Sequence, residues 1–485
     1  MIHLDLLPFF IPELAAGTGD ECRFTRFFNS ALIPLKWQNF LVKNCKKLIL
    51  FLLKNLVLWL YGIDSENLLT LTIKIFFMKL KLTSTFWVMA FALLVFASCS
   101  KDEATTETSP ANPEAAQAFS EPIPGQYIVV YKESGKLQGD HQLNKSAVRT
   151  KTQNLLSENL ISDAEILQVY SAALSGVTVR MTKDQVAKLR NSSDIAYIEQ
   201  DRVLTLAPPC GTPNGGPCDD PGDGDGGSGS QETPYGIARV NGGVSYTGSG
   251  VAWVIDTGID LDHADLNVDA SRGYNAFTSG KDSKSLDDGN GHGTHVAGTI
   301  AAINNDIGVI GVAAGATVIP VKVLDSRGSG SYSGVINGVD HVAANGSSGD
   351  VANMSLGGPV SDALDTAVKN AASKGIKFSL AAGNDSDDAN NYSPARANGT
   401  NIVTISAMDS SDYFASFSNF GNPPVDYCAP GVSIKSTWKD GGYNTISGTS
   451  MAAPHAAGVL LLGNASTDGT VNGDPDGSAD AIIVH

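Results

Sequence analysis

Short, largely apolar segments alternate with helical patterns along the second half of this chain, and this alternation most constrains its fold. The apolar segments are residues 251–255, 318–323, 351–355, 378–381 and 402–407. Strands with such nearly continuous apolar runs are typical of parallel sheets whose two faces are both covered by helices. From residue 231 onward, the sequence therefore predicts an α/β fold with a parallel sheet and helices on both faces.

A smaller module precedes this region. Strand-like and helical segments follow one another in the order β-α-β-β-α-β, at residues 127–131, 143–160, 166–170, 176–180, 183–190 and 196–199. This order is typical of a ferredoxin-like α+β domain. We expect that domain over residues 122–206 and the larger domain over 231–485. Between them, residues 207–230 are almost entirely Gly, Pro, Asp and Ser, which predicts an exposed linker.

The N-terminal region carries targeting signals. Residues 1–77 mix apolar runs with lysines without a helical or strand period, and we expect them not to be part of the true product. Residues 78–98 have the layout of a signal peptide, and the small residues before Cys99 resemble a bacterial lipoprotein cleavage site, which predicts a lipid on Cys99. An ordinary signal peptide or a membrane anchor are the alternatives. Residues 99–121 are rich in Ala, Glu, Thr, Ser and Pro, which predicts a disordered tether.

Charge and cysteine content argue against two classes of protein. The formal net charge of −17 disfavours a nucleic-acid-binding surface. Six cysteines in 485 residues are too few for a disulfide-stapled scaffold. Cys210 and Cys218 could pair across a short loop, which would leave Cys428 free.

Three segments place an acid, a base and a nucleophile at the ends of predicted elements. Asp256 ends an apolar strand, at the sheet edge where open α/β sheets bind their ligands. His292 follows a glycine turn at the start of a helix, and Ser450 begins another helix-like run. A serine hydroxyl needs a neutral imidazole to accept its proton, and an aspartate on the far ring nitrogen fixes the tautomer. The three residues therefore predict nucleophilic catalysis by Ser450.

A fourth apolar strand ends near Asn384. The carbonyl that a serine attacks develops negative charge, and a side-chain amide beside the Ser450 N–H would stabilise that charge. We therefore include Asn384 among the candidate catalytic residues.

Each motif alone permits another interpretation. Asp-Thr-Gly also occurs in aspartic proteases, but these need two such acids and the sequence has one. His292 and His295 could belong to a metal-dependent hydrolase, yet no carboxylate or cysteine follows at ligand spacing. We expect His295 to be structural, and Asp287 and Asp288 to be solvated surface acids rather than groups that act on His292.

Taken together, the motifs resemble the signatures of subtilisin-like serine proteases of the subtilisin and proteinase K type. They are residues 256–258 (DTG), 292–298 (HGTHVAG), 381–384 (AAGN) and 448–455 (GTSMAAPH). The resemblance covers about residues 231–485. It implies a secreted serine endopeptidase of broad specificity that works through an acyl-enzyme intermediate. An inactive binding protein of the same shape is the main rival, and such a protein would be expected to lack a catalytic residue.

The same resemblance implies a peptide-binding groove. Family members hold an extended peptide as an added strand between two segments, which correspond here to Ser329, Gly330, Ser331, Ser355, Leu356 and Gly357. Main-chain pairing reads the substrate backbone, so we expect broad specificity, with a preference for apolar side chains before the cut. A glycine loop and a core strand without this role are the alternative.

The resemblance also implies a structural calcium ion. The residues that match the family's ligands are Gln231, Asp265, Ile303, Asn305, Ile307 and Val309. Alternating carbonyl and side-chain oxygens suit this hard cation. A polar surface loop is the alternative.

The module at 122–206 resembles the family's inhibitor-like propeptide, and this resemblance implies that the chain is a self-processing zymogen. Its expected partners are protein substrates and its own propeptide. If Cys99 is lipidated, the precursor would be anchored in the bacterial outer membrane, and a cut between Leu206 and Gln231 would free the enzyme. Residues 465–480 are polar and rich in Asp and Gly, and they leave the packing of this end open.

Overall fold

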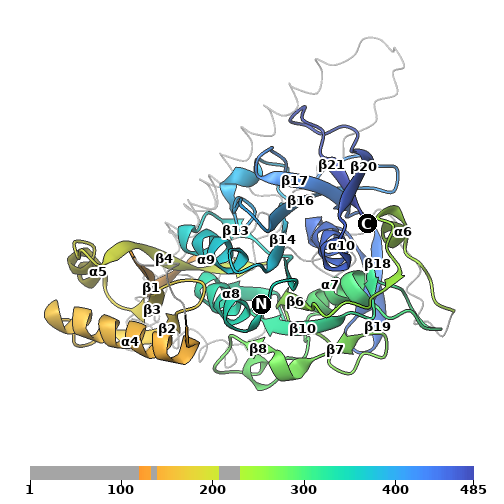
Figure 1. Cartoon of the computed structure of the whole chain (residues 1–485). Coiled ribbons are helices and arrows are strands. Elements are labelled where there is room, and N and C mark those ends of the chain that lie inside the picture. The colour runs from red at the N-terminus through yellow and green to blue at the C-terminus, as the bar shows by residue number, and fades with distance from the viewer. Residues whose placement is uncertain (1–119, 133–138, 207–229) are drawn as a thin grey trace, which may run out of the picture. The chain divides into compact units, whose positions relative to one another are not determined.

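The computed structural model describes residues 120–132, 139–206 and 230–485 (Figure 1). The expectations for the signal segment, Cys99, most of the tether, Cys210, Cys218 and the linker lie outside these residues. No helix in the described ranges is long and apolar enough to cross a lipid bilayer.

A ten-stranded sheet organises the region after residue 230, in the order β20-β21-β17-β16-β14-β12-β6-β10-β7, with β8 also paired to β10. All its pairs are parallel except β20 with β21, which confirms the predicted parallel sheet. The strands are β6 (Ala252–Asp256), β7 (Asn267–Val268), β8 (Tyr274–Asn275), β10 (Thr317–Lys322), β12 (Val351–Met354), β14 (Lys377–Ala381), β16 (Ile402–Met408), β17 (Val425–Pro430), β20 (Ser466–Thr470) and β21 (Ala481–Val484).

Helices cover both faces of this sheet, as predicted (Figure 1). They are α7 (His292–Ala301), α8 (Tyr332–Asn345), α9 (Asp362–Ala372) and α10 (Thr449–Leu462). Trp253 and Ile255 of β6 pack with α8 and α9, whereas Ala252 and Val254 pack with α7 and α10. Because successive side chains of a strand point to opposite faces, β6 is buried from both sides.

Shorter elements complete this region. They are α6 (Tyr235–Arg239), β5 (Val244–Ser245), β9 (Ala313–Ala314), β11 (Ser329–Ser331), β13 (Gly358–Pro359), β15 (Tyr392–Ser393), β18 (Ile434–Trp438) and β19 (Gly442–Ile446).

The smaller module has the predicted order of elements. They are β1 (Pro122–Tyr131), α4 (His141–Glu158), β2 (Glu165–Tyr170), β3 (Gly176–Arg180), α5 (Lys183–Leu189) and β4 (Ile195–Thr205). Its antiparallel sheet runs β4-β1-β3-β2. β4 extends well beyond the predicted end at residue 199, because its last residues pair with β11 of the larger region. A local sequence pattern cannot show a partner that lies so far along the chain.

Residues 465–480, whose packing the sequence left open, contribute β20 and the loop that leads to β21. β21 joins the sheet through a parallel pair between Ile482 and Cys428 of β17. Cys428 is buried and free, as expected.

Candidate active site

Asp256 and His292 meet at the carboxyl end of β6. Asp256 is the last residue of β6 and His292 the first residue of α7, and both are buried. His292 Nδ1 lies 2.8 Å from Asp256 Oδ1 and 3.0 Å from Oδ2. The Thr257 N–H donates to Asp256 Oδ1 at 2.7 Å and helps to fix the carboxylate. With Nδ1 bound to Asp256, the other ring nitrogen of His292 is left to act as a base.

Two glycines permit this close approach of strand and helix. Gly291 caps α7 with φ of 114°, a left-handed conformation that favours glycine. At Gly293, a Cβ would lie 2.1 Å from the Gly258 carbonyl oxygen. A larger residue at position 293 would therefore push His292 away from Asp256.

Asp288 is buried, which corrects the expectation of a solvated surface acid; Asp287 is exposed, as expected. The Asp288 carboxylate accepts five hydrogen bonds of 2.7–2.9 Å, from the Asn290, Gly291 and Thr294 N–H groups and the Thr257 and Thr294 hydroxyls. It satisfies free N–H groups at the start of α7 and links them to Thr257. An acid shortly before a helix start could have indicated this role.

Electrostatics favour protonation of His292. Burial would lower its pKa, but the charge and hydrogen bond of Asp256 outweigh burial, and Asp288 adds a smaller effect. The pKa of His292 is therefore raised above its ordinary value of 6.5. In contrast, burial lowers the pKa of His295 to about 3, and its Nε2 bonds to the Ile434 carbonyl oxygen at 2.9 Å. His295 thus lies in the core, as expected, and does not pair with His292 as a metal ligand.

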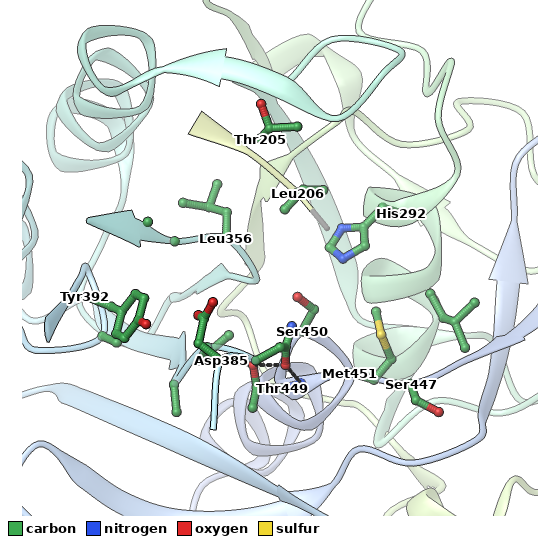
Figure 2. A pocket seen from close by; sticks show the side chains of 18 residues that line it. Thr205, Leu206, His292, Leu356, Asp385, Tyr392, Ser447, Thr449, Ser450 and Met451 are labelled. Atoms are coloured by element: carbon green, nitrogen blue, oxygen red, sulfur yellow. Dashed lines mark hydrogen bonds between the residues drawn. The ribbon is translucent and has the colours of Figure 1, made fainter. Parts of the chain in front are cut away.

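Ser450 is the second residue of α10 and is held by Ser355. Pro454 has no N–H, so the Ser450 carbonyl lacks its donor within the helix. Ser355 Oγ donates to that carbonyl at 2.7 Å, and Ser450 Oγ donates to the Ser355 carbonyl at 3.1 Å. Among the described residues, Ser450 Oγ forms no hydrogen bond with His292, so the predicted contact between them is not formed here. Both residues line the same pocket, and a change of the Ser450 rotamer would redirect the hydroxyl (Figure 2).

Asn384 lies just beyond β14 and lines this pocket. Its Oδ1 accepts hydrogen bonds from the Thr449 N–H at 2.8 Å and the Thr449 hydroxyl at 2.9 Å. In the described part of the chain its amide nitrogen makes no hydrogen bond. The contacts with Thr449 therefore orient the side chain and leave its N–H donors available.

The end of the smaller module enters the pocket. β4 pairs antiparallel with β11, with Thr205 opposite Ser329, Leu204 opposite Gly330 and Val203 opposite Ser331. The Leu206 N–H donates to the Gly328 carbonyl at 2.9 Å. Figure 2 shows Thr205 and Leu206 in the pocket with His292 and Ser450. The last residues of the smaller module thus pair with the first segment that the sequence predicts to bind a peptide.

Of the second predicted segment, Leu356 and Gly357 line the pocket, and Ser355 contacts Ser450 as described. Small apolar residues, Ala381, Ala382 and Ala395, form another part of the lining. Apart from the catalytic candidates, the polar side chains of the wall are those of Thr205, Asp385, Tyr392, Ser447 and Thr449.

Three carboxylates join the smaller module to the larger region, and sequence reasoning missed all of them. Asp340 of α8 accepts hydrogen bonds of 2.7–3.1 Å from the N–H groups of Ser171, Ala172 and Ala173. Glu199 accepts from the Ser361 hydroxyl at 2.5 Å and the Ala363 N–H at 3.3 Å, and Asp201 accepts from the Ser333 N–H at 3.1 Å. Glu199 and Asp201 thus lie at the positive N-terminal ends of α9 and α8.

The predicted calcium ligands lie together. Gln231 Nε2 donates to the Ile303 carbonyl at 2.7 Å and lies 3.3–3.4 Å from the Val309 carbonyl oxygen and Asn305 Oδ1. Asp265 accepts from the Asn305 amide at 2.9 Å and the Val309 N–H at 3.1 Å. The Ile307 N–H donates to Asn305 Oδ1 at 2.9 Å. Within the described ranges no three acidic, imidazole or thiol side chains are grouped to hold a metal, but this loop offers mainly carbonyl and amide oxygens.

Family models match both parts of the chain. A model described as the subtilase family matches residues 249–469, and one described as peptidase inhibitor I9 matches residues 126–207. An extracellular serine proteinase of a Thermus species is 40% identical over 398 residues, 78% of this chain and 88% of the relative. Subtilisin NAT of Bacillus subtilis subsp. natto is 41% identical over 298 residues, 60% of this chain and 70% of the relative. The solved structure of a cold-adapted subtilisin-like serine proteinase is 41% identical and matches 51% of this chain and 96% of its own, with a TM-score of 0.44.

Proposed function

Because this chain belongs to the subtilase family and is a subtilisin-type serine peptidase, we propose that Asp256, His292 and Ser450 form its catalytic triad. The enzyme would be a secreted endopeptidase of broad specificity, made as a self-processing zymogen. The buried Asp256–His292 pair at 2.8 Å, which shares a pocket with Ser450, is the observation that carries this proposal.

The proposed reaction begins when the Ser450 hydroxyl turns from the Ser355 carbonyl toward His292 Nε2. Ser450 Oγ bonds to the substrate carbonyl carbon while its proton moves to Nε2, and Asp256 stabilises the imidazolium. The C–N bond then breaks, and His292 gives the proton to the leaving amine. Water, deprotonated by His292, hydrolyses the acyl-enzyme in the same way. The Ser450 N–H and the free amide N–H of Asn384 would bind the oxyanion.

Class-specific inhibitors test this proposal. We expect the matured protein to hydrolyse casein and to lose that activity after stoichiometric reaction with phenylmethylsulfonyl fluoride. A metal-dependent hydrolase would resist this reagent and stop at once with a chelator. Casein hydrolysis that resists phenylmethylsulfonyl fluoride and stops at once with a chelator would contradict the proposal.

Asn384→Leu is expected to lower kcat by about 10²–10³-fold with little change in KM, the magnitude found when this donor is removed from a subtilisin. Asn384→Asp is the matched control, because it keeps an oxygen for Thr449 but lacks the N–H donor. Steady-state kinetics on a peptide amide after complete self-processing would measure both. Near-normal kcat in Asn384→Asp would show that Asn384 only supports Thr449.

The tail contacts support the zymogen proposal. Residues 203–206 lie where a substrate strand would pair with β11, and so the module that matches an inhibitor family would block its own active site until it is removed. An extracellular relative supports secretion. The lipid on Cys99 and the preference for apolar side chains stay predictions.

Calcium is the proposed structural cofactor of the loop at residues 303–309. The Gln231 amide nitrogen lies where three oxygens meet, and rotation of that amide would present its oxygen as a further ligand. Bound calcium would hold Gln231 and this loop against Asp265 and would take no part in the reaction.

Removal of calcium is expected to lower stability before activity. For a cation present at about 100 times its Kd, the loss is about 2.7 kcal/mol of unfolding free energy. The measurement is the melting temperature of the Ser450→Ala chain in excess chelator and after addition of calcium or magnesium. We expect restoration by calcium alone and a smaller response in Asn305→Ala. Equal melting temperatures with and without calcium would contradict the proposed cofactor.

A further inference from the structure

The loop between β20 and β21 carries polar side chains at alternate positions: Asn472, Asp474, Asp476, Ser478 and Asp480. Gly477 follows Asp476 and has φ of 81°. Calcium loops of the EF-hand type place oxygen ligands at the first, third, fifth, seventh and ninth positions, with the seventh a backbone carbonyl and a glycine at the sixth for the sharp turn. The twelfth position, normally a glutamate, is the buried Ile483, and the Asn472 amide at the first position donates to the Asp412 carbonyl at 3.3 Å. This loop therefore has two ligands fewer than an EF-hand loop.

A buried carboxylate oxygen without a partner gives an independent indication of a ligand. Asp480 is 2% exposed, and its Oδ2 accepts a hydrogen bond from the Ser406 hydroxyl of β16. Its Oδ1 is buried and makes no hydrogen bond with any described residue. A buried charged oxygen that lacks a partner is unfavourable, and a cation at that position would remove this cost.

Other oxygens of the loop lie around Asp480. Asp474 and Asp476 lie close enough for their charges to act on the Asp480 carboxylate, and the Asn422 amide also lies near it. That amide donates its hydrogen bond to the Ser478 carbonyl at 3.0 Å. An N–H donor thus already sits beside the oxygens that would bind a cation. Rotation of the Asn422 amide would present its oxygen instead.

The loop is ordered by its own acids. Asp474 accepts from the Asp480 N–H at 3.1 Å and the Asp476 N–H at 3.3 Å, and Asp476 accepts from the Ser478 N–H at 2.6 Å. In the described residues no three acidic side chains yet converge on one point, so the exposed Asp476 carboxylate would have to turn inward.

We propose that residues 472–480 bind a calcium-like divalent cation through the carboxylates of Asp474, Asp476 and Asp480 and the Ser478 carbonyl. This site is separate from the loop at residues 303–309. Through Asp480 and Ser406 the cation would fasten the β20–β21 hairpin to β16, where β21 otherwise has a single parallel pair with β17. β20 is exposed along its whole length, whereas Ile482, Ile483 and Val484 of β21 are buried, so the cation would add to the attachment that this packing already gives the hairpin.

Calcium titration of the intact Ser450→Ala chain tests the site, because this chain cannot lose parts by self-cleavage. After removal of metal, calorimetry with calcium chloride in excess magnesium should show one site that Asp476→Asn abolishes and another that Asn305→Ala abolishes. Asp476 is exposed, so its substitution does not threaten the fold. Asp468→Asn removes the same charge from β20 outside the loop and should leave both sites intact.

Hydrogen exchange gives a second readout that does not depend on stoichiometry. Calcium should slow exchange of the amides at residues 471–484 in the parent chain and have no effect there in Asp476→Asn or Asp474→Asn. Unchanged calcium stoichiometry in both variants, or exchange of this hairpin that is indifferent to calcium, would overturn the inference. Loss of binding only in Asn305→Ala would also overturn the inference, but it would support calcium in the loop at residues 303–309. Loss of binding only in Asp476→Asn would support the site at residues 472–480 and contradict the calcium of the proposed function.

Discussion

Ser450→Ala is expected to abolish self-processing and to lower kcat by about 10⁶-fold, the magnitude found when the nucleophile is removed from a subtilisin. The change removes the hydroxyl that attacks the substrate carbonyl after His292 takes its proton in the proposed reaction. The fold should survive, because the lost hydrogen bond to the Ser355 carbonyl contributes only about 0.5–1.5 kcal/mol.

The measurement combines electrophoresis of the chain after refolding with casein hydrolysis and thermal unfolding. Ser411→Ala is the control, because Ser411 is exposed and does not line the pocket, and this variant should process normally. A Ser450→Ala chain that matures at the wild-type rate with its fold intact would show that another residue is the nucleophile.

Asp256→Asn is expected to slow self-cleavage by about 10⁴-fold, because an amide can donate to His292 Nδ1 and stabilise the wrong tautomer. The pH dependence should change as well. In the native chain, burial lowers the His292 pKa, but Asp256 outweighs it and raises the pKa above 6.5. Because the base must be neutral, activity should fall as the pH drops through this raised value. Without the Asp256 charge burial dominates, so the acid limb should move to lower pH.

The first-order rate of self-cleavage after refolding, followed over a pH series, measures both effects in one chain. Because the cleavage is intramolecular, its first-order rate is also insensitive to traces of a contaminating protease. An acid limb at the same pH in native and Asp256→Asn chains would mean that His292 is not the titrating base.

The sequence predicted the sheet and the element ends because both depend on local pattern. The run at 251–255 is apolar throughout and the run at 378–381 has a single polar residue, Ser379. Such runs occur in strands covered on both faces, and so Asp256 and Asn384 could be placed at one sheet edge. The glycine turn before His292 marked the start of α7 in the same way.

What the sequence left out depends on partners far along the chain. Asp288 looks like a surface acid until the backbone N–H groups of α7 surround it, and Asp340 finds its three donors in another module. The length of β4 is set by β11, and the direction of the Ser450 hydroxyl by the carbonyl of Ser355. Apart from the position of Asp288 shortly before α7, none of these contacts follows from a period or a motif in the sequence.

The most direct test of the central claim is covalent labelling of the matured enzyme by a sulfonyl fluoride, with the site located by peptide mass spectrometry. The proposed triad predicts one label per chain on Ser450, complete loss of casein hydrolysis, and a labelling rate that falls at acidic pH as His292 is protonated. A label on a different residue, or proteolysis that persists when Ser450 is fully modified, would contradict it.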